Sequence, residues 1–232
     1  MTKKTIWDSF KKSLLVMAGY ILLGIGFGVL LRDAGYGVLW ALAMCVLIYA
    51  GALQYVGVGL IAGGAGIINT ILISIAVNAR HLFYSISMID KYRDAGRKKP
   101  YLAFALTDET YSLLCDGECP DGVDKHSFFF LVSLFNQCYW VIGGVMGNLL
   151  GNVIPFDTGG IEFSMTALFV ASFVSQWKTT KNHTPALIGL FCSLVCLIIL
   201  GAEHFLIPAM LIITFVLLLL RKSTDERKEP EK

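Results

Sequence analysis

Long stretches without a charged residue alternate with short charged segments along this chain. A helix needs about 20 residues to cross a bilayer core of roughly 30 Å, so the uncharged stretches 13–31, 182–202 and 204–220 each predict one membrane span. The stretch 126–156 predicts one longer or tilted span. Because the apolar positions do not alternate with a period of two, the pattern favours helices over strands. The sequence therefore predicts an all-α, polytopic helical membrane protein with about seven spans or broken helices.

The segment 35–89 does not divide evenly into spans, because it is too long for two helices and tight for three. It is rich in glycine, which loosens helices and lets backbones approach closely. We expect 36–64 to be a broken, hairpin-like element that re-enters from the outer face, followed by a helix over 66–89 that runs inward. The sequence alone leaves open whether 36–64, and a similar element around 160–178, span the membrane or re-enter.

The charged residues lie mostly in four windows, 1–12, 90–99, 116–125 and 221–232. Lysine and arginine flank membrane helices preferentially on the cytoplasmic side. If 36–64 re-enters, the basic loop 90–99 is cytoplasmic, whereas an ordinary span there would place this loop outside. The charges therefore favour re-entry.

The rest of the layout follows from this choice. A short helix over 100–115 is expected to run outward, the acidic loop 116–124 to lie outside, and 126–152 to return. A second broken element around 160–178 then leaves both termini cytoplasmic, with a tail over 221–232. The protein is thus predicted to be a multi-pass membrane protein.

Composition narrows the class further. The hydrophobic residue types make up 56% of the chain, only 16% of residues are charged, and the mean hydropathy is +0.67. Soluble domains average about 25% charged residues, so a water-soluble fold is excluded. The net charge of +2 arises in segments that flank apolar stretches and does not indicate nucleic-acid binding. Lys11 and Lys12 resemble the start of a signal peptide, but no small-residue cleavage pattern follows, and we expect the first helix to be retained.

Two parts of the chain, 14–89 and 126–202, resemble each other. In the layout above they have opposite orientations, which predicts an inverted-topology repeat within a single transmembrane transporter domain over 1–232. Such repeats place a substrate site near the membrane midplane on discontinuous helices. A chance resemblance is the alternative, since the matches are few and partly glycine. The matching pairs are Tyr20 with Tyr139, Gly24 with Gly143, Gly28 with Gly147, Leu30 with Leu149, Leu31 with Leu150, Gly37 with Gly159, Gln54 with Gln176 and Tyr55 with Trp177.

The predicted helix 66–89 carries an unusual polar stripe. One face carries four polar residues at helical spacing, Ser74, Asn78, His81 and Ser85. Arg80 lies about 100° from His81. An arginine within a membrane helix is costly and normally faces a polar interior or an opposite charge. Polar contact between helices is the alternative explanation, but Arg80 favours a permeation or ion-pair site.

Asp108 and Glu109 are the expected partners of Arg80, because they lie in the middle of the predicted short helix 100–115. Two adjacent carboxylates at membrane depth cannot both ionise cheaply, so one is expected to be neutral or paired with Arg80. A carboxylate that binds and releases a proton suits a proton-coupled transporter. The alternative is an interfacial helix whose carboxylates are simply hydrated.

Gln54 and Gln176 lie in the two predicted broken elements. An amide offers both donors and acceptors, which suits an amino acid zwitterion and suits equally the backbone groups freed by an unwound turn. Weaker candidates of the same kind are Asn136, Gln137, Asn148 and Asn152.

No catalytic, metal or cofactor motif stands out. The four histidines are scattered, and no H-E-x-x-H, G-x-S-x-G or P-loop pattern occurs. Cys115 and Cys119 could form a disulfide or a weak metal site, but no histidine or second cysteine pair has matching spacing. We therefore predict that the protein is not an enzyme and has no metal or cofactor.

Three motifs give the chain a recognisable pattern: YAGALQ over 49–54, NARHLFYS over 78–85 and TDETY over 107–111. In their order and spacing, the chain resembles the AzlC family, the large subunits of bacterial branched-chain amino acid exporters. The resemblance implies export of branched-chain and similar amino acids across the inner membrane, with a small AzlD-type membrane subunit as partner and the proton gradient as driving force.

The sequence thus predicts a secondary transporter for a small, mainly apolar amino acid. Its predicted substrate and ion path contains Gln54, Asn78, Arg80, His81, Asp108, Glu109 and Gln176. The leading alternative is an uncoupled channel or pore subunit for small solutes. A structural subunit whose partner performs the transport is a further alternative.

Overall fold

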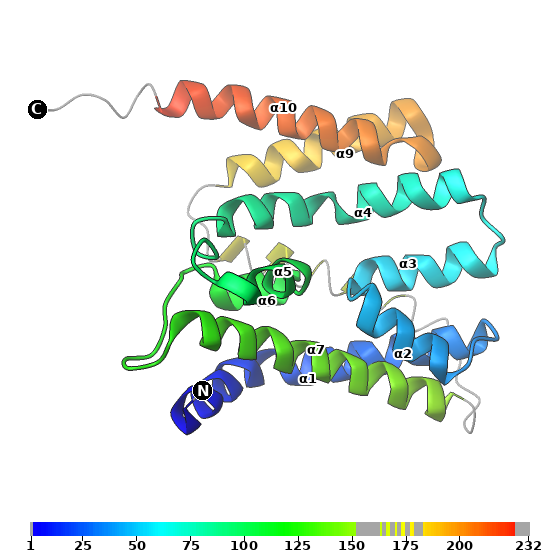
Figure 1. Ribbon diagram of the computed structural model, residues 1–232. Coiled ribbons are helices and arrows are strands. Elements are labelled where there is room, and N and C mark those ends of the chain that lie inside the picture. Colours follow the sequence, from blue (N-terminus) through cyan, green and yellow to red (C-terminus); the bar gives the residue numbers. More distant parts are fainter. Residues whose placement is uncertain are drawn as a thin grey trace, which may run out of the picture. The chain divides into compact units, whose positions relative to one another are not determined.

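The computed structural model describes residues 2–151 and 183–225, with a few single positions between 163 and 178 (Figure 1). The chain divides into two units, Met1–Thr166 and Ala167–Lys232. These described residues are predominantly helical, which confirms the predicted all-α class. The first unit contains α1 (Lys3–Asp33), α2 (Val38–Leu47), α3 (Gly51–Ala62), α4 (Ile67–Met88), a 3-10 turn (Gly96–Lys98), α5 (Lys99–Phe104), α6 (Asp108–Leu114) and α7 (Lys125–Leu150), and the second contains α9 (Thr184–His204) and α10 (Leu206–Asp225).

Within the described part of the chain, four helices are long and apolar enough to cross a membrane: α1, α4, α7 and the Thr184–Gly201 part of α9. They correspond to the predicted helices 13–31, 66–89, 126–156 and 182–202. The predicted span 204–220 is α10, which packs against α9 and has a shorter apolar part, Leu211–Leu220.

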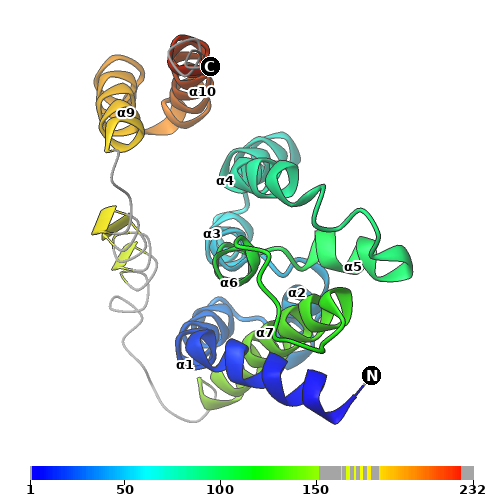
Figure 2. The same ribbon diagram turned by 90° about the vertical axis from the view of Figure 1, so that its left-hand side faces the viewer.

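α1 and α7 run side by side in the same direction (Figure 1, Figure 2). Near their starts, Ser9 Oγ donates a hydrogen bond to the Phe128 carbonyl over 3.4 Å, and near their ends Asn148 Nδ2 donates to the Gly28 carbonyl over 3.2 Å. Glycines line this contact, and a Cβ atom built on Gly143 would lie only 2.6 Å from the Ile21 carbonyl oxygen. The two backbones touch because small residues let membrane helices approach closely.

The glycines that match each other in the sequence, Gly24 with Gly143 and Gly28 with Gly147, are the residues that meet across this contact. The predicted inverted orientation is therefore wrong for the first helices of the two copies, because α1 and α7 are parallel. A shared requirement for close packing accounts for the matching glycines without any inversion.

The predicted broken element over 36–64 is a helical hairpin formed by α2 and α3. Its helices have 10 and 12 residues, each too short to span a bilayer at 1.5 Å per residue. The chain turns between them at Tyr49, whose φ of 40° lies in the left-handed region. α2 begins and α3 ends at the same end of the unit (Figure 1), so this element is a hairpin that does not run from one end of the unit to the other.

α5 and α6 form a second broken hairpin, which begins and ends at the opposite end of the unit. Lys98 Nζ lies 3.5 Å from Asp124 Oδ2, and Lys4 Nζ donates a hydrogen bond to the Asp121 carbonyl over 2.5 Å. The acidic loop thus lies beside the basic loop and the start of α1. The expectations that 100–115 crosses the membrane and that 116–124 lies on the far side are wrong. The reason is local, because Thr107 caps a new helix, α6, and the chain turns back.

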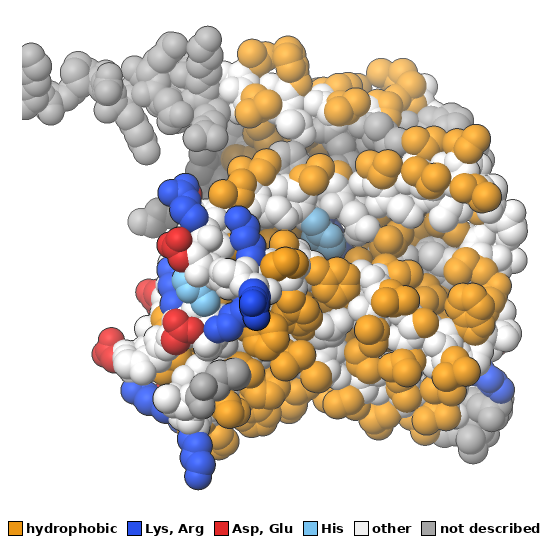
Figure 3. All heavy atoms as spheres, in the orientation of Figure 1, with side chains coloured by type: hydrophobic (Ala, Val, Ile, Leu, Met, Phe, Trp, Pro, Cys, Tyr) orange, Lys and Arg blue, Asp and Glu red, His pale blue; other side chains and the backbone are white. Residues whose placement is uncertain are grey.

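One end of the first unit is charged. It consists of the start of α1 with its lysines (residues 3–12), the basic loop (90–99) and the acidic loop (116–124). Figure 3 shows blue and red side chains gathered at this end, while apolar side chains cover much of the remaining visible surface of its helices. Asp124 accepts a hydrogen bond from the Ser127 amide over 2.8 Å and caps α7. Interactions with the side chain and backbone of Ser127 lower the pKa of the Asp124 carboxyl.

The tips of the two hairpins meet halfway along α1 and α7. The rings of Tyr49 and Phe104 lie 6.2 Å apart, and Ala105 belongs to the same buried cluster as Tyr49. One α7 side chain contacts both hairpins, since Gln137 accepts from the Tyr101 hydroxyl over 2.7 Å and donates to the Val46 carbonyl over 3.3 Å. Non-helical backbone at membrane depth is tolerated where protein surrounds it, as it does here.

Enlarging a glycine at the α1–α7 contact should destabilise the protein. In Gly147→Ala the new methyl group would overlap the Ile25 backbone, and overpacking typically costs about 1–3 kcal/mol. We expect a lower melting temperature of the purified protein in detergent. Gly19→Ala, in α1 with no atom within 4 Å of the new Cβ, is the matched control and should melt at or above the wild-type temperature. Equal melting of the two variants would contradict the contact.

The arrangement of the loops can be tested by labelling single cysteines. In a cysteine-free background, Arg93→Cys and Asp121→Cys should react with a membrane-impermeant maleimide from the same side of the membrane, because both loops lie at the charged end. Labelling from opposite sides would contradict this arrangement and support the layout expected from the sequence, in which the segment 100–115 crosses the membrane.

Candidate functional site

Three of the residues predicted from the sequence meet between α4 and α6. Arg80 Nη1 lies 2.7 Å from Asp108 Oδ2, and His81 Nε2 lies 3.8 Å from Asp108 Oδ1. Arg80 and Asp108 are about one quarter exposed, at 26% and 29%. Asp108 is the first residue of α6, where the helix dipole favours a negative charge. The predicted ion pair across these two segments is therefore present in the structure.

Glu109 has different surroundings, although it is the next residue along the chain. Its Oε2 atom accepts a hydrogen bond from the Tyr20 hydroxyl of α1 over 2.7 Å. Among the described residues, no lysine, arginine or histidine nitrogen lies within 4.0 Å of its carboxylate. The two carboxylates thus have different partners: Asp108 pairs with Arg80, whereas the Glu109 carboxyl is hydrogen-bonded by Tyr20.

A chain of polar groups extends from Glu109 into the core. The Tyr20 hydroxyl lies 2.6 Å from Thr107 Oγ1, which lies 3.0 Å from Thr110 Oγ1, and Asn136 Nδ2 donates to Thr110 Oγ1 over 3.0 Å. Tyr20, Thr107, Thr110 and Asn136 are all buried. The chain joins α1, α6 and α7 at the height where the two hairpins meet. Tyr20 was not identified as a site residue from the sequence, because its role depends on a contact with a segment far along the chain.

Asn78 lies half-buried on α4, on the stripe that the sequence predicted. Its Oδ1 atom and the Oδ1 atom of Asp108 are both buried and have no hydrogen-bond partner among the described residues. Leaving a buried acceptor unsatisfied costs about 1–3 kcal/mol. Such atoms, close to an ion pair, mark a place where a ligand or water can supply the missing donors.

Gln54 lies apart from this ion pair, in the core at the start of α3. It is fully buried, accepts a hydrogen bond from Trp140 Nε1 over 2.8 Å and donates to Cys45 Sγ over 3.5 Å. The amide therefore joins both arms of the α2–α3 hairpin to α7. The other predicted glutamine, Gln176, lies outside the described residues.

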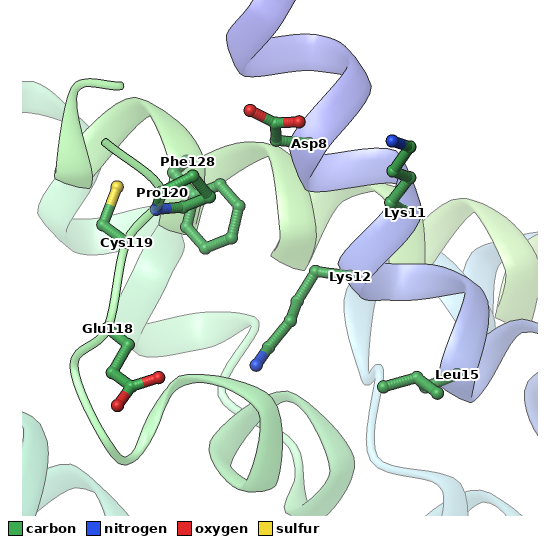
Figure 4. A pocket seen from close by; sticks show the side chains of 8 residues that line it. All are labelled: Asp8, Lys11, Lys12, Leu15, Glu118, Cys119, Pro120 and Phe128. Carbon is green, nitrogen blue, oxygen red and sulfur yellow. The ribbon is translucent and has the colours of Figure 1, made fainter. Parts of the chain in front are cut away.

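A separate pocket of about 550 Å³ opens at the charged end, between the start of α1 and the acidic loop (Figure 4). Its lining contains charges of both signs, and Figure 4 shows Lys12 reaching into it. Cys119 at its edge is a free thiol, as is Cys115, so the two do not form the disulfide that their spacing allowed. None of the residues of the predicted substrate and ion path lines this pocket, which consists of Asp8, Lys11, Lys12, Leu15, Glu118, Cys119, Pro120 and Phe128.

Known proteins resemble the chain over most of its length. A family model described as "AzlC protein" matches residues 15–154, the region that holds Gln54, Arg80, Asp108 and Glu109. The chain is 40% identical over 231 residues to "Branched-chain amino acid transport protein AzlC" of Bacillus subtilis (strain 168), an alignment that covers 97% of this chain and 91% of that protein.

Two further relatives are membrane proteins by name. The chain is 41% identical over 210 residues to an "Uncharacterized membrane protein" of Haemophilus influenzae, covering 90% of this chain and 86% of the relative. It is 25% identical over 194 residues to "Inner membrane protein YgaZ" of Escherichia coli (strain K12), covering 80% and 79%. No solved structure matches the chain. These relatives and the apolar helices confirm the predicted helical membrane protein.

Neutralising both members of the Arg80–Asp108 pair should destabilise the protein by less than the two single neutralisations added together. Arg80→Gln or Asp108→Asn leaves one charge without its partner, and hydrogen bonds to charged groups contribute about 1.5–3 kcal/mol. We expect each single variant to lower the melting temperature in detergent, and the double variant to lower it by less than the sum of the two. Additive effects would show that the two side chains do not interact.

Proposed function

The chain belongs to the AzlC family, and on that premise we propose that it is a secondary transporter that exports branched-chain or similar apolar amino acids across the bacterial inner membrane. The Bacillus subtilis relative, named for branched-chain amino acid transport, supports the substrate class. The observation that carries the mechanism is Glu109, a half-buried carboxylate with no adjacent cation in the described structure, at the height where two broken hairpins meet.

Glu109 is proposed to bind either a proton or the ammonium group of the substrate. A carboxylate in a low-dielectric site is stabilised by a cation or by protonation, and it cannot hold both ligands favourably. Export coupled to proton inflow follows from this competition. Release of the substrate outside leaves Glu109 free to take a proton, and release of that proton inside makes it available for the next substrate.

Arg80 and Asp108 are proposed to line the path beside this carboxylate. Because their charges compensate each other over 2.7 Å, the pair adds a polar surface without adding net charge. Asn78 and His81 extend the same surface along α4. Gln54 is proposed to act from the core, by holding the unwound turn between α2 and α3 where the substrate passes.

The two hairpins are proposed to act as opposed gates. The α2–α3 hairpin enters from one end and the α5–α6 hairpin from the charged end, so withdrawal of one tip opens the site to one side only. The lysines and arginines at the charged end favour a cytoplasmic position for it, and hence for the N-terminus. We place the C-terminus in the cytoplasm as well.

A small AzlD-type membrane subunit is the proposed partner, as membership of the family implies. Three large apolar side chains of α4, Ile67, Ile68 and Ile75, are 79%, 75% and 62% exposed, so this helix presents an apolar surface to lipid or to another subunit. The alternative function is an uncoupled channel, in which the ion pair would only make the path polar.

Transport in proteoliposomes tests the role of Glu109. With the small subunit present, Glu109→Gln should lower leucine flux driven by a pH gradient at least about tenfold, because the side chain can no longer carry a proton. Asp108→Asn should reduce flux as well, since it releases the charge of Arg80. Glu118→Gln, in the exposed acidic loop, is the control and should transport like the wild type.

Unimpaired pH-driven flux in both Asp108→Asn and Glu109→Gln would remove these carboxylates from the coupling mechanism. If leucine flux through the wild type does not depend on the pH gradient and does not saturate with leucine concentration, the result would instead support the uncoupled channel. A requirement for the small subunit is tested by repeating the assay without it.

A further inference from the structure

Two buried polar atoms near the hydrogen-bond network that reaches Glu109 have no hydrogen-bond partner among the described residues. They are the hydroxyl of Tyr49 and the Oδ1 atom of Asn136. Tyr49 is 3% exposed and Asn136 is 0% exposed. Buried polar atoms in folded proteins are nearly always hydrogen-bonded, and exceptions require an explanation. Here both atoms belong to side chains at the meeting point of the two hairpins.

Tyr49 forms the tip of the α2–α3 hairpin. Its φ of 40° is a conformation that tyrosine rarely adopts, and its ring packs on Phe104 of the opposing hairpin. Its hydroxyl lies near those of Tyr20 and Thr110 but does not complete a hydrogen bond with either. A residue held in a strained conformation with an unused hydroxyl is more consistent with ligand binding than with support of the fold.

Asn136 approaches the same place from α7. Its Nδ2 atom donates to Thr110 Oγ1 over 3.0 Å, which fixes the side chain and leaves Oδ1 as an unused acceptor. Thr110 is therefore the common neighbour of Tyr49 and Asn136. Through Thr107 and Tyr20, the same network reaches the Glu109 carboxylate over hydrogen bonds of 3.0, 2.6 and 2.7 Å.

The unused groups have one chemistry in common. An amide oxygen and a carboxylate can only accept hydrogen bonds, and a phenol oxygen can accept one as well. The matching ligand carries several N–H donors and a positive charge. We propose that Tyr49, Asn136 and Glu109 form the subsite for the primary ammonium group of the transported amino acid. This inference rests on the proposed function and specifies which part of the substrate is recognised and where.

This subsite explains how the protein would distinguish an amino acid from the oxo acid of the same shape. The oxo acid has no N–H group, so on binding it could accept a hydrogen bond from the Tyr49 hydroxyl but would leave Asn136 Oδ1 unsatisfied and place its carbonyl oxygen near the Glu109 carboxylate. A site with unpaired polar groups rejects the analogue that fails to satisfy them.

The test is a thermal-shift titration of the purified protein with L-leucine, 4-methyl-2-oxopentanoate, which has no ammonium group, and 3-methylbutylamine, which has no carboxylate. In the wild type, leucine should raise the melting temperature and the oxo acid should not. Tyr49→Phe removes only an unpartnered hydroxyl, so without ligand it should melt at or above the wild-type temperature. It should nevertheless need at least about tenfold more leucine for the same shift.

Tyr92→Phe is the matched control. Tyr92 is also buried, at 4% exposure, with an unpartnered hydroxyl, but it lies in the loop that follows α4. This variant should have unchanged or higher stability and a wild-type response to leucine. Asn136→Leu, which also loses the bond to Thr110, should lower stability and weaken the leucine response, provided that it still folds.

The outcomes separate the subsite from the proposed function. If Tyr49→Phe responds to leucine as the wild type does, or if the oxo acid shifts the wild type as much as leucine, the subsite is wrong while amino acid transport stands. If the wild type responds to the amine in a Tyr49-dependent way but not to leucine, the ammonium subsite stands and the proposed substrate class is wrong. If neither leucine nor the amine raises the melting temperature of the wild type, the proposed subsite is wrong.

Discussion

The close contact between α1 and α7 is the constraint on which the rest of the first unit depends. Glycines allow the two backbones to touch, since a Cβ atom on Gly143 would lie only 2.6 Å from the Ile21 carbonyl oxygen. The two helices therefore form a closely packed pair. Near the middle of the two helices, this pair carries several large polar side chains, among them Tyr20 of α1 and Asn136, Gln137 and Trp140 of α7. They hold the tips of both hairpins through hydrogen bonds, and they satisfy polar groups that lipid could not.

The break at Thr107 determines the chemistry at this height. It starts α6 in the middle of the protein, and adjacent residues on a helix point about 100° apart. Asp108 therefore faces Arg80 of α4, whereas Glu109 faces Tyr20 of α1. The two neighbouring carboxyl groups therefore have different partners. Asp108 is paired with the guanidinium of Arg80, whereas Glu109 accepts a hydrogen bond from the phenol of Tyr20. In the proposed mechanism Glu109, which no cation contacts within 4.0 Å in the described structure, is the carboxyl group that exchanges its ligands.

The same region combines groups that stabilise the fold with groups that do not. Gln54 uses both ends of its amide and is fully buried, which is the pattern of a residue that supports the structure. The Tyr49 hydroxyl and Asn136 Oδ1 are equally buried and unused within the described structure. Since an unsatisfied buried group lowers stability by about 1–3 kcal/mol, these groups cost stability at the place where the two broken hairpins meet, and the proposed ammonium subsite would account for that cost.

The sequence by itself determined the helical membrane class, the broken element over 36–64, the expected pairing of Arg80 with an acidic residue of 107–110 and the family resemblance, because hydropathy, charge and short motifs are local properties. Only the tertiary structure decided the direction of α7, the side on which the acidic loop lies, and which carboxylate lacks a cation. Matching glycines show that two faces pack closely but not whether the helices are parallel, and a single capping threonine reverses a segment that hydropathy predicts to cross. The role of Tyr20 depends on a hydrogen bond to a residue 89 positions away, and no local pattern contains such a contact.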